Sequence, residues 1–189
     1  MSENLEAIWT GVLSALARGA IDRRSPMHTP VVSTADADAR VMVLRHLDTA
    51  EQTARFHTDA RAPKVAVIKR DPDIGLLFYD REAKLQIRCR GRARIENEGP
   101  SADRAWLEST NFARRCYLGA APGAVSNAPT SGLPDWAEGI EPSDSQLEAA
   151  RQNFAVLLVD LIEIDWFSLA HTGHRRAIFV RGEGRWISP

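Results

Sequence analysis

Two cationic side chains and a hydroxyl group lie close together where a helix is expected to begin. Arg61 and Lys64 are one helical turn apart, and Thr58 precedes them. A helix start offers unpaired backbone N–H groups and the positive end of the helix dipole, which suit a phosphate group. Arginine adds a planar fork of donors, and lysine adds a point charge. The segment predicts a phosphate site, although a solvated basic helix start with no ligand would have the same sequence.

Arg40 and Arg45 are a second pair of cationic residues, expected on a single strand. They are five positions apart, so on a straight strand their side chains point to opposite faces. At about 3.3 Å per residue they are separated by roughly 16 Å, about the length of a phosphorylated, planar ligand lying along the strand. Both could contact one ligand only across a bulge or at a strand edge. The alternative is that one of them is a surface arginine.

Gln86 is an uncharged polar residue on the otherwise basic face of a predicted strand. Its amide can both donate to and accept from the edge of a heterocycle. The cationic residues of that face are Lys84, Arg88, Arg90, Arg92 and Arg94. A solvated or dimer-facing surface is the alternative for most of these five.

The apolar pattern predicts the elements that position these residues. Apolar residues at helical spacing predict a helix over 3–18, within an N-terminal helical segment 1–20 that stops near Gly19. From about 28 to 96 the period is mainly two, which predicts strands. Strands are expected at 27–33, 40–47, 53–58, 74–79, 84–96, 154–166, 176–180 and 185–187, and helices at 61–70, 102–109 and 143–153. The first two strands read as a hairpin, and 118–143 is a long loop rich in glycine and proline.

The strand over 84–96 has the clearest pattern. Residues with odd numbers are apolar or small and residues with even numbers are polar, which is typical of a half-buried antiparallel strand. Gly91 in its middle indicates a bulge or a close backbone approach. Many short strands with few helices predict a mainly β fold with an antiparallel barrel core.

Composition limits the classes of function. The chain has 189 residues, 44% hydrophobic and 26% charged, with a formal net charge of -1, so nothing draws it globally to nucleic acid or membranes. No apolar run reaches the roughly 20 residues of a transmembrane helix, and no secretory signal is visible, so we expect a cytoplasmic protein. Cys89 and Cys116 do not form a disulfide framework. His171 and His174 lack an accompanying carboxylate or cysteine cluster, so no metal site is predicted.

These motifs together resemble the FMN-binding split-barrel proteins related to pyridoxamine 5'-phosphate oxidase. The resemblance rests on Arg-x-x-x-Leu-Arg at 40–45, aromatic-x-Thr at 56–58, the Arg61–Lys64 pair and Gln-x-x-x-x-Gly at 86–91. It recurs in Ile-Asp-Trp at 164–166 and His-Arg-Arg at 174–176. It implies a homodimer with FMN at the subunit interface. It also implies cofactor contacts for Arg40, Val41, Met42, Val43, Arg45, His57, Thr58, Arg61, Lys64, Gln86, Trp166 and Arg176.

The chain departs from the true oxidases where those enzymes hold their substrate. His57 stands where they usually have tyrosine, and 105–113 lacks their tyrosine, arginine and serine set. Thr-Gly-His at 172–174 lacks the arginine of their Arg-x-His motif. The resemblance is therefore to a divergent branch with another substrate, for which 118–143 is a candidate pocket wall.

We therefore expect a single domain over 1–189 that binds FMN and acts as an oxidoreductase on an unidentified small molecule. The flavin would supply hydride chemistry, while Gln86 and Arg45 would favour its anionic reduced form. No catalytic side chain is assigned. The alternatives are a non-catalytic flavin- or tetrapyrrole-binding protein on the same barrel and a nucleic-acid-binding barrel.

Overall fold

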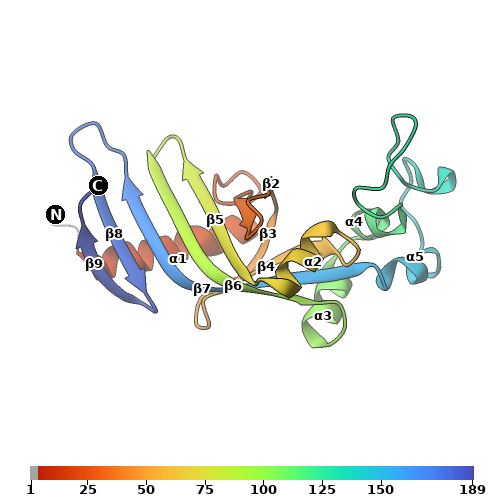
Figure 1. Ribbon diagram of the computed structural model, residues 1–189, viewed down its shortest axis with the longest axis horizontal. Helices are drawn as coiled ribbons and strands as arrows, with labels where there is room; N and C mark the ends of the chain where they lie inside the picture. The colour runs from red at the N-terminus through yellow and green to blue at the C-terminus, as the bar shows by residue number, and fades with distance from the viewer. Residues whose placement is uncertain (1–3) are drawn as a thin grey trace. The chain divides into compact units, whose positions relative to one another are not determined.

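The strand with the alternating pattern is central to the fold. In the computed structural model of the protein, which describes residues 4–189, it is β6 (Leu85–Glu96) (Figure 1). Ile87, Cys89 and Ala93 are buried, whereas the arginines that alternate with them are exposed. The predicted alternation is confirmed. Gly91 makes the expected close approach, because a Cβ atom there would collide with the backbone oxygen of Asp160.

The described residues form a nine-stranded sheet with the order β2-β1-β5-β6-β7-β4-β3, in which β8 pairs with β7 and β9 pairs with β8. The pairs β1–β2, β1–β5, β3–β4, β5–β6, β7–β8 and β8–β9 are antiparallel. The fold is the predicted antiparallel split barrel with short flanking helices. Its other strands are β1 (Val31–Thr34), β2 (Ala39–Val41), β3 (Leu44–Asp48), β4 (Thr53–Asp59), β5 (Asp73–Asp80), β7 (Phe154–Ser168), β8 (Arg175–Val180) and β9 (Glu183–Ile187).

The segment 40–47, expected to be one strand, is two strands instead. The dipeptide Met42–Val43 separates β2 from β3, which stand at opposite ends of the strand order. The backbone N–H of Met42 donates to Pro30 O at 3.0 Å, and that of Leu44 donates to His28 O at 2.9 Å. The chain thus switches between the two ends of the sheet at this point. The predicted hairpin is confirmed only for β1 and β2.

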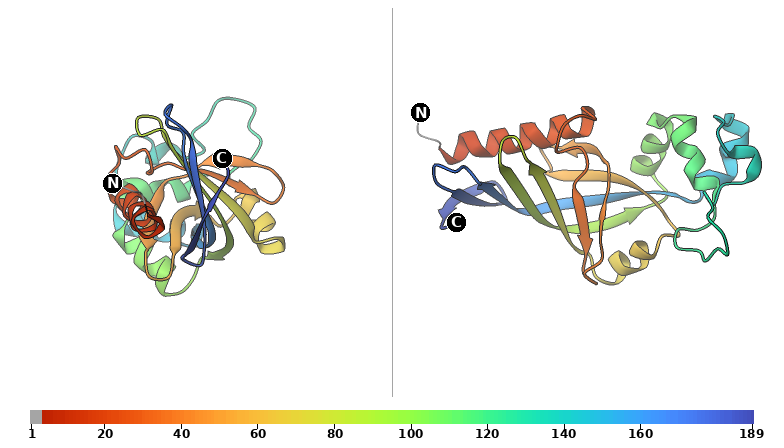
Figure 2. Two further views of the ribbon diagram at one scale, coloured as in Figure 1. Left: turned by 90° about the vertical axis from the view of Figure 1, so that its left-hand side faces the viewer. Right: turned by 90° about the horizontal axis from the view of Figure 1, so that it is seen from above.

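Helix α1 (Leu5–Ile21) covers one face of the sheet. The Asn4 side chain accepts from Ala7 N at 2.7 Å and caps its first turn. The helix packs against β3 and β9 (Figure 2). The Trp9 ring on the helix lies 5.2 Å from that of Phe179. The predicted helix is confirmed from Leu5 onward and is longer than expected; position 3 lies outside the described residues. Gly19, the predicted stop, is inside the helix.

The chain divides into two compact units. Unit 1 holds the chain up to Phe56, Asp71–Arg94 and Leu158–Pro189, and unit 2 holds His57–Arg70 and Ile95–Leu157. Unit 2 contains α2 (Pro63–Arg70), α3 (Pro100–Glu108), α4 (Asn111–Arg114), α5 (Asp144–Arg151) and the 3₁₀ turns η1 (Arg115–Leu118) and η2 (Asp135–Ala137). The three helices predicted in this region are confirmed with small boundary shifts, whereas α4 was not predicted. Among residues 4–189, no helix is long and apolar enough to span a membrane.

Candidate functional site

The predicted phosphate site lies in unit 2, between the end of β4 and the start of α2. Thr58 is buried at 4% exposure, and Lys64 in the first turn of α2 donates from Nζ to Thr58 Oγ1 at 3.2 Å. Pro63 is the first residue of the helix. A backbone N–H at this position has no partner within the helix, so proline costs no hydrogen bond there. A lysine ammonium and a threonine hydroxyl are therefore held together at a helix start. Such a set of donors suits a phosphate group.

The guanidinium of Arg61 is tied to its own surroundings. Its Nε donates to Asp59 Oδ1 at 3.0 Å and its Nη2 to Asp59 Oδ2 at 2.7 Å, while Nη2 also donates to Gly119 O at 3.0 Å. The hydrogen bonds that Arg61 donates to the Asp59 carboxylate raise the pKa of Arg61. The Asp59 carboxylate also accepts from Arg61 N at 2.8 Å, which shapes the turn before α2. Arg61 therefore secures the turn and the segment at Gly119, and its Nη1 is not used in these bonds.

An aromatic cluster lies in the same unit. The Phe154 ring is 5.0 Å from His57, 5.0 Å from Tyr117 and 5.4 Å from Trp106. Asn153 holds this cluster in place. The Asn153 side chain donates to Tyr117 O at 2.9 Å, and the Asn153 carbonyl accepts from Ala60 N at 2.7 Å. His57 thus packs on an aromatic ring at the end of β4. The cluster gives the residues before α2 a rigid base.

In unit 1, Arg40 is engaged on β2, and Arg45 is exposed on β3. Arg40 Nη1 donates to Thr34 Oγ1 at 3.1 Å and to Val32 O at 3.3 Å, and Nη2 pairs with Asp38. The expectation that the two arginines share one straight strand is wrong, because the chain switches strands between them. Val41 between them is 64% exposed.

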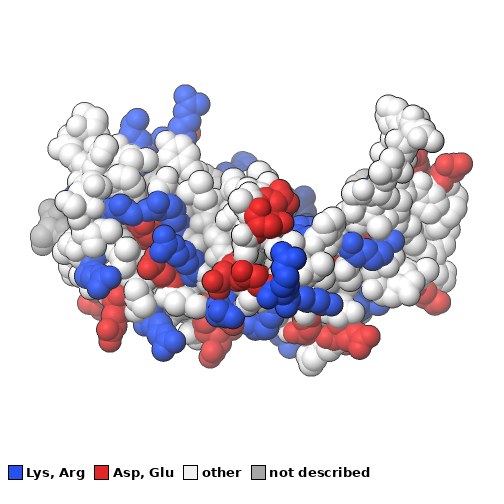
Figure 3. Space-filling model, in the orientation of Figure 1, with Lys and Arg blue, Asp and Glu red and all other residues white. Residues whose placement is uncertain are grey.

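Gln86 lies on the predicted basic face of β6, which we call the outer face of unit 1. Its register partner on β5 is Tyr79, 48% exposed, and Leu77 on the same face is opposite Arg88. On the face of the molecule that Figure 3 shows, Lys and Arg side chains are interspersed with Asp and Glu side chains. Gln86 is thus an amide bordered by an aromatic ring and by paired charges.

Asp165 on β7 is a buried carboxylate that sequence reasoning did not single out. It is 5% exposed and pairs with Arg176 on β8 and Arg88 on β6. Burial opposes its ionisation, yet the hydrogen bonds from the two arginines hold the pKa of Asp165 below its usual value. An acid flanked by apolar residues in a mainly apolar strand was the signal that could have revealed it, because such a group needs a partner when it is buried.

The Trp166 side chain is on the opposite face of β7 from Asp165. It is 8% exposed, is opposite Ala177 on β8, and its ring lies 6.4 Å from that of Trp186 on β9. Trp166 and Arg176, expected from the resemblance to contact one cofactor, therefore come from adjacent strands but pack among different neighbours. Phe167 lies under Arg176, with the guanidinium 5.5 Å from the ring centre.

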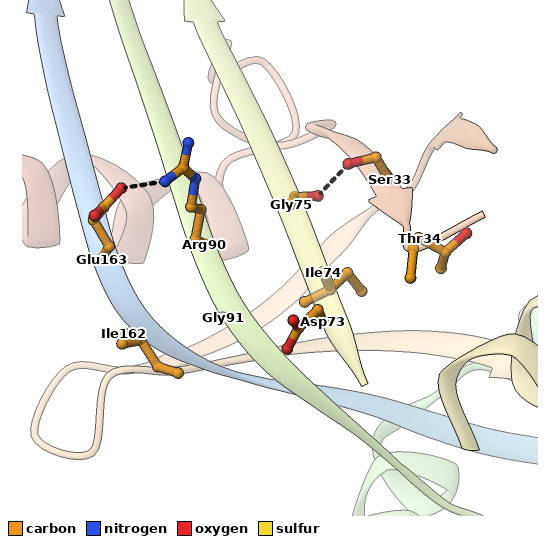
Figure 4. Close-up of a pocket in the computed structure, with 10 residues that line it drawn as sticks. Ser33, Thr34, Asp73, Ile74, Gly75, Arg90, Gly91, Ile162 and Glu163 are labelled. Atoms are coloured by element: carbon orange, nitrogen blue, oxygen red, sulfur yellow. Dashed lines mark hydrogen bonds and ion pairs between the residues drawn. The ribbon is translucent and has the colours of Figure 1, made fainter. Parts of the chain in front are cut away.

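A hollow of about 440 Å³ opens on unit 1 (Figure 4). Arg90 and Glu163 form an ion pair of 3.4 Å on one side, and the Ser33 hydroxyl donates to Gly75 O at 3.4 Å on the other. Its lining residues are Ser33, Thr34, Ala35, Asp73, Ile74, Gly75, Arg90, Gly91, Ile162 and Glu163. This lining includes none of the twelve predicted cofactor residues, so the hollow is not the predicted site.

Solved structures share this strand arrangement. A pyridoxamine 5'-phosphate oxidase-related, FMN-binding protein from Nostoc punctiforme is similar over 100% of both chains, with a TM-score of 0.72 and 20% identity. PhzG from Burkholderia lata, in complex with tetrahydrophenazine-1-carboxylic acid, has a TM-score of 0.67 and 16% identity over 95% of this chain and 91% of its own. A protein related to general stress protein 26 from Clostridium acetobutylicum has a TM-score of 0.54 and 10% identity over 97% and 95%. At such identities the likeness establishes the fold.

The sequence match defines the family. The family model described as pyridoxamine 5'-phosphate oxidase matches residues 24–126, more than half of the 189 residues. The chain belongs to this family, as the motifs predicted. The matched region includes Arg40 through Gln86 and ends before Trp166 and Arg176. No curated protein matches the chain.

Proposed function

We propose that the protein binds FMN and uses it as an oxidoreductase on a small molecule that is not pyridoxamine 5'-phosphate. The observation that carries the proposal is the family match over 24–126, which contains the cationic and amide residues at 40–45, 58–64 and 86. Bound FMN would supply two-electron transfer, and the protein would supply binding and electrostatics.

The phosphate of FMN would be bound at the start of α2. Lys64 Nζ and Thr58 Oγ1 are 3.2 Å apart there, and the helix start adds backbone N–H donors. Arg61 would contribute through Nη1 while its other nitrogens hold Asp59 and Gly119. Charge-assisted bonds of this kind are the strong ones in phosphate recognition.

Gln86 and Arg45 are the proposed contacts of the flavin ring. Gln86 offers an amide that can donate and accept at the pyrimidine edge. Arg45 is exposed on β3, where it would stabilise negative charge on the reduced ring. The remaining contacts are proposed for Arg40, Val41, Met42, Val43, His57, Trp166 and Arg176.

We also propose a homodimer that covers the outer face of unit 1. Neighbouring strands place exposed apolar side chains side by side there, since Val31 is opposite both Val41 and Leu77. Their exposed fractions are 36%, 64% and 38%. Adjacent exposed apolar groups of this kind are typical of association sites. A second copy of the chain is the proposed partner.

The visible spectrum of the purified protein, with and without added FMN, tests the cofactor. Saturable binding with a perturbed flavin spectrum is expected, and unperturbed free flavin at all protein concentrations would refute FMN binding. Reduction of the bound flavin by NADH or NADPH, followed by reoxidation in air with turnover, would support the oxidoreductase. A flavin that binds but does not cycle with either donor or with an added electron acceptor would favour the non-catalytic alternative.

A further inference from the structure

Asp165 joins three neighbouring strands of unit 1 through its carboxylate. Arg176 on β8 grips it with two parallel bonds, Nε to Oδ1 at 3.0 Å and Nη2 to Oδ2 at 2.7 Å. Arg88 on β6 donates from Nη2 to Oδ2 on the other side. The carboxylate is 7% exposed, whereas the Arg88 side chain is 45% exposed and that of Arg176 is 24% exposed. One buried acid therefore anchors two arginines that reach toward solvent.

One arginine would be enough to neutralise the acid. With two, the cluster of Asp165, Arg88 and Arg176 has a formal net charge of +1. The bonds to Asp165 use Nε and Nη2 of Arg176 and Nη2 of Arg88, so other N–H groups of both guanidiniums are not needed for the anchor. Each guanidinium is planar and rigid, so fixing one edge fixes the direction of the other.

The cluster adjoins residues that the proposed function uses. Arg88 is two residues from Gln86 and on the same face of β6, and Arg176 is itself a proposed contact. The same two central strands hold a second pair, Arg94 with Asp160, whose side chains are 51% and 50% exposed. That pair is a matched control, because it has the same residue types on β6 and β7 without the burial or the second arginine on β8.

We propose that Asp165 is a positioning residue for flavin binding, which orients Arg176 and Arg88 so that their remaining N–H groups contact the bound flavin. The inference rests on the proposed function and adds Arg88 as a contact and Asp165 as the group that acts through both arginines. A positioning role and a purely electrostatic role of Asp165 predict opposite changes in FMN affinity when Asp165 is replaced. Removing a negative charge should strengthen the binding of anionic FMN, whereas removing an anchor should weaken it.

The test is FMN titration of Asp165→Asn beside Asp160→Asn. Loss of one charge-assisted contact should weaken FMN binding by roughly 10- to 150-fold in Asp165→Asn, and loss of a second contact should weaken it further. Asp160→Asn should stay within about twofold of wild type. Unchanged or tighter binding by Asp165→Asn would overturn the positioning role. A wild type that does not bind FMN would overturn the proposed function and the inference together, so the two failures are distinguishable.

Two further variants separate positioning from loss of structure. Asp165→Glu keeps the charge but displaces the carboxylate by one methylene, so weaker FMN binding is expected, and wild-type affinity would count against the proposal even if Asp165→Asn did not fold. The double variant Asp165→Asn with Arg176→Lys should bind FMN no more weakly than the worse single variant, because both changes remove the same anchored contact. Fully additive losses would refute it. The visible circular dichroism of bound FMN should change in Asp165→Glu and not in Asp160→Asn.

Discussion

Replacing Lys64 by alanine should weaken FMN binding and leave riboflavin binding nearly unchanged. Lys64 lies in the first turn of α2 with Nζ 3.2 Å from Thr58 Oγ1, and one of its three N–H groups serves that hydroxyl. The ammonium group therefore lies at the helix start proposed to bind the phosphate. Riboflavin lacks that phosphate, so the two ligands isolate the contact.

The expected magnitude follows from one charge-assisted contact. Such a bond contributes about 1.5–3 kcal/mol, which corresponds to roughly a 10- to 150-fold rise in the FMN dissociation constant. Lys69→Ala is the matched control, because Lys69 lies in the last turn of the same helix, is exposed, and is far from the N-terminal donors. Its FMN affinity should match that of the wild type.

Arg61→Ala should behave differently from Lys64→Ala. It removes the bonds to Asp59 and to Gly119 O and leaves a carboxylate of 9% exposure without its arginine. Since the Arg61 side chain is about a third exposed, solvent would moderate the penalty to about 1–2 kcal/mol of unfolding free energy. Thermal melts should therefore separate the two variants.

Fluorescence titration of each variant with FMN and with riboflavin is the assay. The reasoning is refuted if Lys64→Ala binds FMN as tightly as Lys69→Ala does. It is equally refuted if the affinity for riboflavin falls by the same factor as that for FMN, because the lysine would then act on something other than the phosphate.

Four further outcomes are expected. Gly91→Ala should lower the unfolding free energy by about 1–3 kcal/mol in chemical denaturation, because its Cβ would collide with the Asp160 backbone oxygen. Burial raises the pKa of Cys89 to about 12, so a thiol reagent at pH 8 should modify the exposed Cys116 alone in the native protein; two reactive thiols would contradict this. Leu77→Arg should give a monomer by light scattering if the outer face is the dimer interface, and an unchanged mass would exclude that face. FMN-loaded protein should form no pyridoxal phosphate from pyridoxamine phosphate; turnover near 1 per second would show that the substrate residues were misread.

The sequence predicted the elements better than their pairing. Alternation over 84–96 identifies β6 because burial of one face acts on each residue locally. Nothing local in 40–47 says that β2 and β3 join opposite ends of the sheet, because that depends on hydrogen bonds to 28–30. Periodicity cannot encode such long-range pairing, and the two strands were therefore predicted as one.

The candidate site was predictable as a set of residue types but not as a set of bonds. Lys64 and Thr58 adjoin as expected, because a strand end and a helix start are fixed by local sequence. The pairing of Arg61 with Asp59 was not foreseen, although only Ala60 separates them. Asp165 was missed because Arg88 lies 77 positions away in the sequence, and because Arg176 comes near it only through the pairing of β7 with β8.

The two-residue link Met42–Val43 limits how this chain can change in evolution. Side chains alternate along a strand, so one residue inserted there would turn the buried Leu44 outward and the exposed Arg45 inward, or force the same exchange on β2. A segment that passes from one end of the strand order to the other therefore has a fixed length. The segment 118–143 has no such restriction, since it contains only one 3₁₀ turn beyond η1. Insertions and deletions among relatives should therefore be found mainly in 118–143, and changes of substrate should accompany them. The length of the segment 40–45 should stay constant.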